Sequence, residues 1–144
     1  VCNSPNSRLG NHMKIRILRE FQDIFVGNPG CFFPDEMPCE LKTLLEQPIL
    51  MLSAKSTTSE YLQQTFTAKG LKLLPEVELN SNDLLMDLAR IGLGIACIPD
   101  YMLDPDDSLK PIPLVTPLPP RQLVLVQHEN LPLSQAAERF LEMF

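Results

Sequence analysis

The sequence has no long apolar run, no CxxC spacing among its cysteines and few positive charges. A membrane-spanning helix needs ~20 consecutive apolar residues, whereas the longest clean apolar runs, such as 94–98, have the length of a buried strand. The 12 Lys and Arg residues are outnumbered by 18 Asp and Glu residues, which gives a formal net charge of −6. Because the basic residues are scattered among acidic ones, the composition disfavours binding to a nucleic-acid backbone. We expect a soluble chain whose partner is a small molecule or another protein.

The four cysteines, Cys2, Cys31, Cys39 and Cys97, are expected to be reduced, which indicates a cytoplasmic protein. A chain of 144 residues is large enough to fold without disulfides. The N-terminus carries neither an initiator Met nor the charged-then-apolar pattern of a signal peptide. This start is the one expected of a chain that begins partway through a longer protein.

Residues that could support catalysis or bind a metal are sparse. His12 and His128 have no Cys or carboxylate neighbour at ligand spacing, so we expect no zinc site. Cys97 lies inside an apolar run and is interpreted as a core residue, and no GxSxG motif occurs. The acidic residues at 104–107 are typical of a solvated surface loop. The sequence therefore predicts neither a cofactor nor an enzyme.

The pattern of apolar residues predicts alternating strands and helices. Alternation of apolar and charged residues at 13–18 indicates a half-buried strand, which continues or restarts at 23–26. We expect helices at 39–47, from 53–59 to Gly70, from 80–83 to Gly92 and after Ser134, and strands at 49–52, 76–79, 95–98 and 123–126, with a weak strand near 110–114. This order is typical of an α/β fold with a mainly parallel sheet covered on both faces. Gly92 and Gly94 flank a helix-to-strand turn, where close approach of the backbone explains both.

The segment Ser53–Ser59, between a predicted buried strand and a helix, is rich in hydroxyl side chains. Ligands of α/β sheets bind at the carboxyl ends of strands, and the N–H groups and dipole of a helix start suit a carboxylate, sulfate or phosphate. Ser56, Thr57 and Thr58 add hydroxyl donors there. The alternative is that one of them only caps the helix. Because the glycines of a phosphate-binding loop are absent, we do not expect a nucleotide.

Several segments together resemble the effector-binding domain of LysR-type transcriptional regulators. They are Ser56-Thr57-Thr58, Ala68-Lys69-Gly70-Leu71, Asp83-Leu84-Leu85, the run from Arg90 to Pro99 (RIGLGIACIP), the run from Pro119 to Val126 (PPRQLVLV) and Leu131-Pro132-Leu133-Ser134. The match runs from about Met13 to the end of the chain. No piece is decisive alone, and the order and spacing of the pieces make the resemblance specific.

The resemblance implies a Rossmann-like parallel or mixed sheet with helices on both faces, as in one lobe of a type 2 periplasmic binding protein. It implies that residues 1–20 belong with the first lobe, that 21–126 form the second lobe, and that the helix in 127–144 returns toward the first lobe. The winged helix-turn-helix that binds DNA in this family, its linker helix and most of the first lobe are absent from this sequence. Family members self-associate, so the resemblance also implies a homodimer or tetramer.

The resemblance further implies which residues contact an effector bound between the lobes. Ser56 and Thr57 match the family's hydroxyl-rich loop, and Thr58 follows them. Asn3 and Ser4 match the strand that leaves the first lobe, while Pro99, Asp100 and Tyr101 border the cleft. Many members carry Arg just after the Ser/Thr pair, where this sequence has Thr58 and Ser59, which argues against a strongly anionic effector.

Together, these features predict a cytoplasmic effector-sensing domain that binds a small polar or anionic metabolite and acts by shifting a conformational equilibrium. The alternatives are a stand-alone solute-binding protein of the periplasmic type, an enzyme on the same α/β lobe that uses Cys97 or His128, and a pure interaction module. Stabilisation of the chain by a ligand distinguishes the effector-sensing domain from the pure interaction module.

Overall fold

The computed structural model describes residues 1–144, which divide into two compact units. Unit 1 consists of Val1–Glu20 and Arg121–Phe144, and unit 2 consists of Phe21–Pro120. The strand that starts at Arg121, which the sequence-based division left with 21–126, falls in unit 1. It does so because it pairs with a strand from the N-terminal segment of the same unit.

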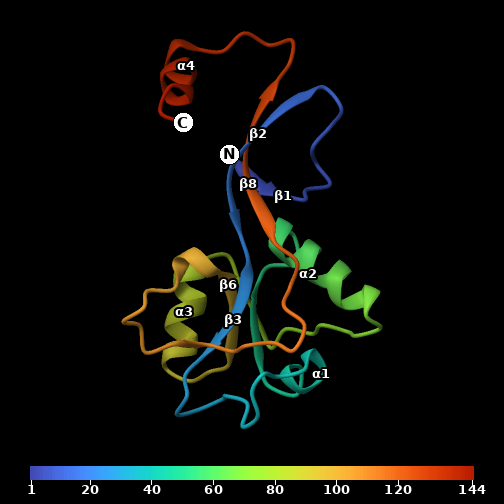
Figure 1. Ribbon diagram of the computed structural model, residues 1–144, viewed down its shortest axis with the longest axis vertical. Helices are drawn as coiled ribbons and strands as arrows, with labels where there is room; N and C mark the ends of the chain where they lie inside the picture. The colour runs from blue at the N-terminus through green and yellow to red at the C-terminus, as the bar shows by residue number, and fades with distance from the viewer. The chain divides into compact units, whose positions relative to one another are not determined.

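Unit 2 is built on a five-stranded mixed sheet with the strand order β5-β4-β6-β3-β7 (Figure 1). Its elements are β3 (Asp23–Gly27), α1 (Leu41–Leu44), β4 (Ile49–Leu52), α2 (Thr57–Ala68), β5 (Val77–Leu79), α3 (Asn82–Arg90), β6 (Ile95–Pro99), the 3-10 helix η1 (Asp100–Met102) and β7 (Lys110–Pro111). β4 runs parallel to β5 and β6, whereas β3 is antiparallel to β6 and β7. The expected mainly parallel sheet is therefore confirmed for the three βα-connected strands β5, β4 and β6, with two antiparallel strands added at one side.

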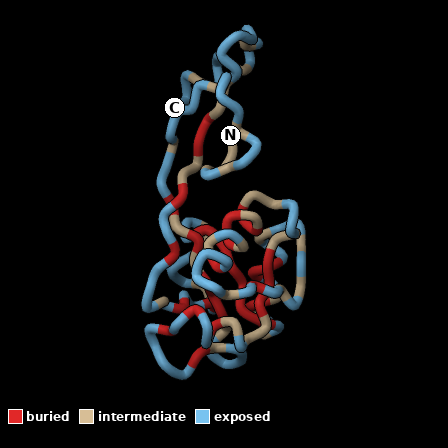
Figure 2. Tube along the Cα trace, turned by 90° about the vertical axis from the view of Figure 1, so that its right-hand side faces the viewer, coloured by how far each residue is buried: buried red, intermediate tan, exposed pale blue.

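The helices of unit 2 cover both faces of this sheet, because neighbouring residues of each buried strand point to opposite faces. On one face, Ile49, Met51 and Cys97 pack with α1 and α2. On the other face, Leu50 and Ala96 pack with α3. Figure 2 shows the buried residues concentrated along the strands and the inner sides of the helices of this unit. The predicted α/β class is confirmed, and so is the interpretation of Cys97 as a core residue.

α2 and α3 start and end where the sequence predicts, and the last helix starts there, because serine caps and glycines satisfy the terminal backbone groups. Ser56, Ser81 and Ser134 each accept a hydrogen bond from a backbone N–H in the first turn of α2, α3 and α4 (Gln135–Leu141). Gly70 and Gly92 follow α2 and α3 with φ angles of +71° and +81°. Both ends show the paired backbone bonds of the Schellman motif, such as Leu71 N–H to Phe66 O at 3.0 Å.

Two predicted elements of unit 2 are shorter than expected. The helix expected at 39–47 spans only Leu41–Leu44. It starts late because Cys39 forms a bridge with the segment at 113–115, and it passes into turns at 45–47, before Pro48. In this bridge the Cys39 N–H donates to Pro113 O at 2.8 Å, and Cys39 O accepts from Val115 N–H at 3.0 Å. The strand expected near 110–114 ends at Pro111, since prolines lack the N–H that a strand ladder needs.

Unit 1 is a three-stranded sheet with one short helix. Its strands are β1 (Cys2–Ser4), β2 (Met13–Phe21) and β8 (Arg121–His128) in the order β1-β8-β2, followed by α4. No residue of α4 is buried, so its apolar side is unpartnered as expected, apart from a Phe140–Phe144 ring contact at 5.0 Å. The Arg16 guanidinium donates to the Phe144 carbonyl and holds the end of this segment to β2.

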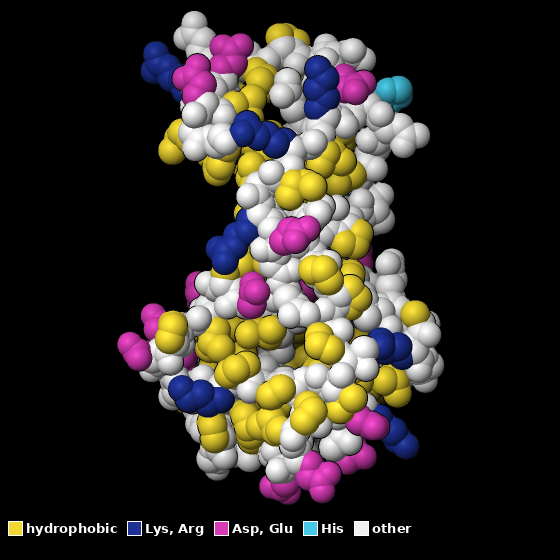
Figure 3. Space-filling view, in the orientation of Figure 1, with side chains coloured by type: hydrophobic (Ala, Val, Ile, Leu, Met, Phe, Trp, Pro, Cys, Tyr) yellow, Lys and Arg dark blue, Asp and Glu magenta, His cyan; other side chains and the backbone are white.

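The surface agrees with the acidic composition. Figure 3 shows Asp and Glu side chains, together with some Lys and Arg, mainly around the margins of the visible face of unit 2, whose middle carries many hydrophobic side chains. The helices of the structure are all too short or too polar to cross a membrane.

Candidate functional site

The carboxyl ends of the parallel strands in unit 2 meet at one edge of the sheet. β4 leads there into the loop before α2, and β6 leads into η1. The start of antiparallel β3 lies at the same edge, where Asp23 is opposite Pro99. The structure thus brings two groups of predicted residues, 56–58 and 99–101, to one sheet edge. The predicted residues Asn3 and Ser4 belong to unit 1, in β1, where they are half-buried and paired with Leu123 and Gln122.

Ser56 is the N-cap of α2. Its Oγ accepts a hydrogen bond from the Ser59 N–H at 3.0 Å, and its carbonyl accepts from Glu60 N–H at 3.0 Å. Its own N–H donates to Ser53 O at 2.8 Å, which closes the turn before the helix. Ser56 therefore caps the helix, and the O–H of its side chain remains as a donor.

The next three side chains differ in their exposure. Thr58 and Ser59 are 6% and 2% exposed, and the Ser59 hydroxyl donates to the Leu52 carbonyl, which fastens the first turn of α2 to the end of β4. Thr57 is half-buried, and its hydroxyl forms no hydrogen bond within the protein. The whole hydrogen-bonding capacity of the Thr57 hydroxyl is thus left for a ligand.

Two other N–H groups of the loop are already occupied. Ser53 N–H donates to Leu79 O at 2.7 Å, and Ala54 N–H donates to the Glu78 carboxylate at 3.1 Å. Sequence reasoning missed Glu78 because its contact depends on the register that places Met51 beside it on β4. The sequence signal for this role is a charged residue, Glu78, between the apolar residues Val77 and Leu79 of a short strand.

The end of β6 is fixed by contacts with the segment before β3. Asp100 N–H donates to Gln22 O at 2.8 Å. The ring of Tyr101 meets that of Phe21 edge-on, with centroids 5.6 Å apart, and remains 42% exposed. Asp23, which sequence reasoning also missed, is 2% exposed and interacts with another group of the protein. An aromatic ring and acidic groups therefore border this edge.

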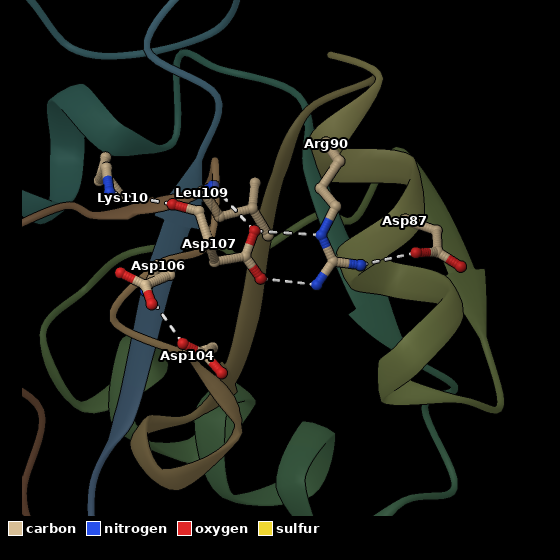
Figure 4. A network of polar contacts seen from close by, with 7 residues as sticks. All are labelled: Asp87, Arg90, Asp104, Asp106, Asp107, Leu109 and Lys110. Atoms are coloured by element: carbon tan, nitrogen blue, oxygen red, sulfur yellow. Dashed lines mark hydrogen bonds and ion pairs between the residues drawn. The ribbon is translucent and has the colours of Figure 1, made fainter.

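The acidic loop at 104–107 is not uniformly solvated, which corrects the expectation from sequence. The Asp107 side chain is 6% exposed and pairs with the Arg90 guanidinium through Oδ1 at 3.1 Å from Nε and Oδ2 at 2.6 Å from Nη2 (Figure 4). Arg90 also reaches Asp87 at 2.6 Å. Hydrogen bonds from Arg90 are the main cause that lowers the pKa of Asp107 to about 2, and the same bonds raise the pKa of Arg90. This pair joins the loop before β7 to the last turn of α3.

The residues weighed as catalytic lie in the core of unit 2 or belong to unit 1. Cys97 is 2% exposed within β6. His128 belongs to unit 1, where its Nδ1 accepts from Asn130 N–H at 3.2 Å, and the carbonyl of His12 accepts from Glu129 N–H at 3.1 Å. Burial raises the pKa of the Cys39 thiol, which disfavours a thiolate there.

Comparisons with known proteins agree on one family. A family model described as the LysR substrate binding domain matches residues 5–144. The "Uncharacterized HTH-type transcriptional regulator YwbI" of Bacillus subtilis (strain 168) is 26% identical over 122 residues, which are 83% of this chain and 40% of that protein. The chain thus spans less than half the length of this curated relative.

Solved structures show the same fold. The regulatory domain of CcmR from Synechocystis PCC6803, in complex with 2-PG, has a TM-score of 0.82 at 14% identity and covers 98% of this chain and 68% of its own. The effector binding domain of QuiR, in complex with shikimate, has a TM-score of 0.80 at 13% identity and covers 95% of this chain and 66% of its own. At these identities the likeness shows the fold alone.

Proposed function

The chain belongs to the LysR substrate-binding domain family, and we propose that it binds a small polar effector for a transcriptional regulator. The observation that carries the proposal is the meeting of the β4–α2 loop and the end of β6 at one edge of the sheet in unit 2. Ligands of open α/β sheets bind outside the carboxyl ends of the strands. Thr57 presents an unused hydroxyl at this edge, and Tyr101 presents an exposed ring.

In this proposal each predicted residue has a definite role. Thr57 hydrogen-bonds the effector, and Ser56 holds the helix start in place as a cap. Asp100 and Tyr101 line the same edge. Asn3 and Ser4, in β1, are the further residues that we propose as effector contacts. The effector acts by its differential affinity for the two arrangements of the regulator, and this mechanism asks for no catalysis by the domain.

The partners follow from the family. A regulator of this kind binds DNA through an N-terminal helix-turn-helix, and the curated relative YwbI carries the HTH-type description. We infer a cytoplasmic homodimer or tetramer in which this chain is the sensing part. Units 1 and 2 correspond in this inference to parts of the two lobes of the effector-binding domain.

The proposal is tested by thermal unfolding and calorimetry of the 144-residue chain with a panel of polar metabolites that includes shikimate and 2-PG. We expect at least one member to stabilise the chain. Thr57→Val, which replaces the hydroxyl with a methyl group, should weaken its binding by ~0.5–1.5 kcal/mol, or roughly 2- to 10-fold.

Thr67→Val on the same helix is the matched control, because Thr67 is exposed near the far end of α2. It should leave the affinity unchanged. Equal affinities of the Thr57→Val and Thr67→Val variants contradict the role of Thr57. A chain that no member of the panel stabilises contradicts the proposed function and favours the interaction module.

A further inference from the structure

A cavity of about 300 Å³ in unit 2 is lined by the start of α1, the chain just after α2 and the segment at 115–116. The β4–α2 loop of the proposed effector site lies at the other end of α2. This helix has 12 residues, and at ~1.5 Å per residue its two ends are ~18 Å apart. The cavity is therefore separate from the effector site proposed above.

Backbone hydrogen bonds hold the walls of this cavity. The Cys39–Leu114 bridge sets the segment at 115–116 beside the start of α1. The Schellman turn after α2 brings the chain back at Leu71, which packs against the same core cluster as buried Leu41. The positions of the walls are thus set by the fold of unit 2.

The apolar part of the lining consists of Leu41, Leu71 and Val115. Val115 is 56% exposed, so its side chain is available to a ligand. An apolar cavity of roughly 150 Å³ already holds a benzene ring. This larger cavity therefore has room for a branched apolar side chain together with a charged group.

The polar part of the lining carries charges of both signs. Lys42, Lys69, Glu40 and Thr116 line the cavity, and all four are exposed. Their side chains form no ion pair or hydrogen bond within the protein. Two ammonium groups and a hydroxyl match a carboxylate, whereas a carboxylate such as that of Glu40 matches an ammonium group. A ligand with both charges therefore complements this lining better than a simple anion or cation does.

A free amino acid carries a carboxylate, an ammonium group and a side chain on one carbon. We propose that this cavity is a second ligand site of the chain, which binds a free amino acid with a branched apolar side chain. Its carboxylate contacts Lys42 and Lys69, its ammonium group contacts Glu40, and its side chain packs on Leu41 and Leu71.

Three probes that share one apolar group test the proposal on the 144-residue chain, with titrations followed by amide chemical shifts. L-Leucine should bind with an affinity in the millimolar range, because exposed charges contribute little each. 4-Methylpentanoate lacks the ammonium group and 3-methylbutylamine lacks the carboxylate. We expect each to bind about two- to fivefold more weakly than leucine, which is the size of one exposed ion pair. An analogue that binds as tightly as leucine, or a chain that does not bind leucine, overturns the proposal.

Lysine variants test the contact with the carboxylate. Methionine keeps the apolar stem of lysine and removes its charge, so the double variant Lys42→Met/Lys69→Met should weaken leucine binding about tenfold. Lys72→Met is the matched control, because Lys72 is exposed and lies outside the lining. It should leave the affinity for leucine unchanged. Equal affinities of the double variant and the control refute the site.

Glu40→Gln tests the contact with the ammonium group. This variant should weaken leucine binding about two- to fivefold. It should not weaken binding of 4-methylpentanoate, which has no ammonium group for Glu40 to contact. An equal loss for both probes contradicts the proposed orientation of the amino acid.

The map of shift changes separates this site from the effector site. Leucine should shift amide signals at Leu41, Leu71 and Thr116, which line the cavity. Changes centred on Thr57 and Tyr101 instead would show that leucine binds at the β4–α2 loop, which overturns the second site and leaves the proposed function in place.

Discussion

Replacement of Asp107 by Asn tests whether the Arg90–Asp107 pair stabilises unit 2. In the folded chain the Asp107 carboxylate accepts two hydrogen bonds from Arg90 and one from Leu109 N–H at 3.0 Å. These bonds favour the charged form, so the pKa of Asp107 falls from 3.8 to about 2. Asn keeps the size of the side chain and removes the charge.

The size of the effect follows from this pKa difference. At ~1.36 kcal/mol per pH unit, it corresponds to about 2 kcal/mol of stability above the unfolded-state pKa. The Asp107 side chain is 6% exposed but that of Arg90 is 35% exposed, so solvent screening reduces the value. We expect Asp107→Asn to lower the free energy of unfolding by about 1–2 kcal/mol at pH 7.

The pH dependence has a definite sign. Because the folded state holds the Asp107 carboxylate deprotonated to lower pH than the unfolded state does, the contribution is fully present above pH ~4. It is lost as the pH falls through about 2, where the folded form takes up its proton. The stability difference between wild type and Asp107→Asn should therefore shrink from pH 4 to pH 2.

Urea unfolding followed by far-UV circular dichroism at several pH values measures this difference, since the chain has no Trp. Asp106→Asn is the matched control, because the carboxylate of Asp106, next to Asp107 in the sequence, is exposed and forms no ion pair. It should change stability by less than about 0.5 kcal/mol. Equal losses in the two variants, or a loss in Asp107→Asn that does not vary with pH, would refute the reasoning.

Two further predictions concern packing. Gly92→Ala should destabilise the chain by at least ~1 kcal/mol, because Gly92 has φ +81° and an added Cβ would lie 2.3 Å from the Cys31 Sγ. Gly10→Ala is the control, because an added Cβ there meets open space, and it should not change the melting temperature. Similar melting temperatures for both variants argue against this packing. A thiol reagent should label exposed Cys31 in the folded chain but reach Cys39 and Cys97, each 2% exposed, only on unfolding; rapid labelling of Cys97 detected by mass spectrometry is the contrary result.

Local signals account for most of the fold that was predictable from sequence. The serine caps and following glycines are short-range devices, and the structure confirms them at α2 and α3. The helix predicted at 39–47 is present but shorter, and a distant segment decides where it starts. Cys39 pairs with residues near 114, and no local pattern reveals that partner.

The candidate site was predictable only in part for the same reason. Its hydroxyl-rich loop lies at a strand-to-helix boundary that the periodicity reveals. Contacts between elements, such as that of Glu78 with Ala54, depend on strand register. The Arg90–Asp107 pair depends on how the loop before β7 folds back against α3. Which carboxylates are paired and which are solvated is therefore a property of the tertiary structure.

The hydrogen bonds of the β4–α2 loop also bear on the charge of the proposed effector. A phosphate group presents three strong acceptor oxygens and needs several donors. Ser53 and Ala54 already donate their N–H groups to Leu79 and Glu78, so the hydroxyl of Thr57 stands beside donors that are occupied. The Glu78 carboxylate adds negative charge next to the loop, which opposes a second anion. A polar effector with little charge at this end therefore fits the proposed site better than a phosphorylated one does.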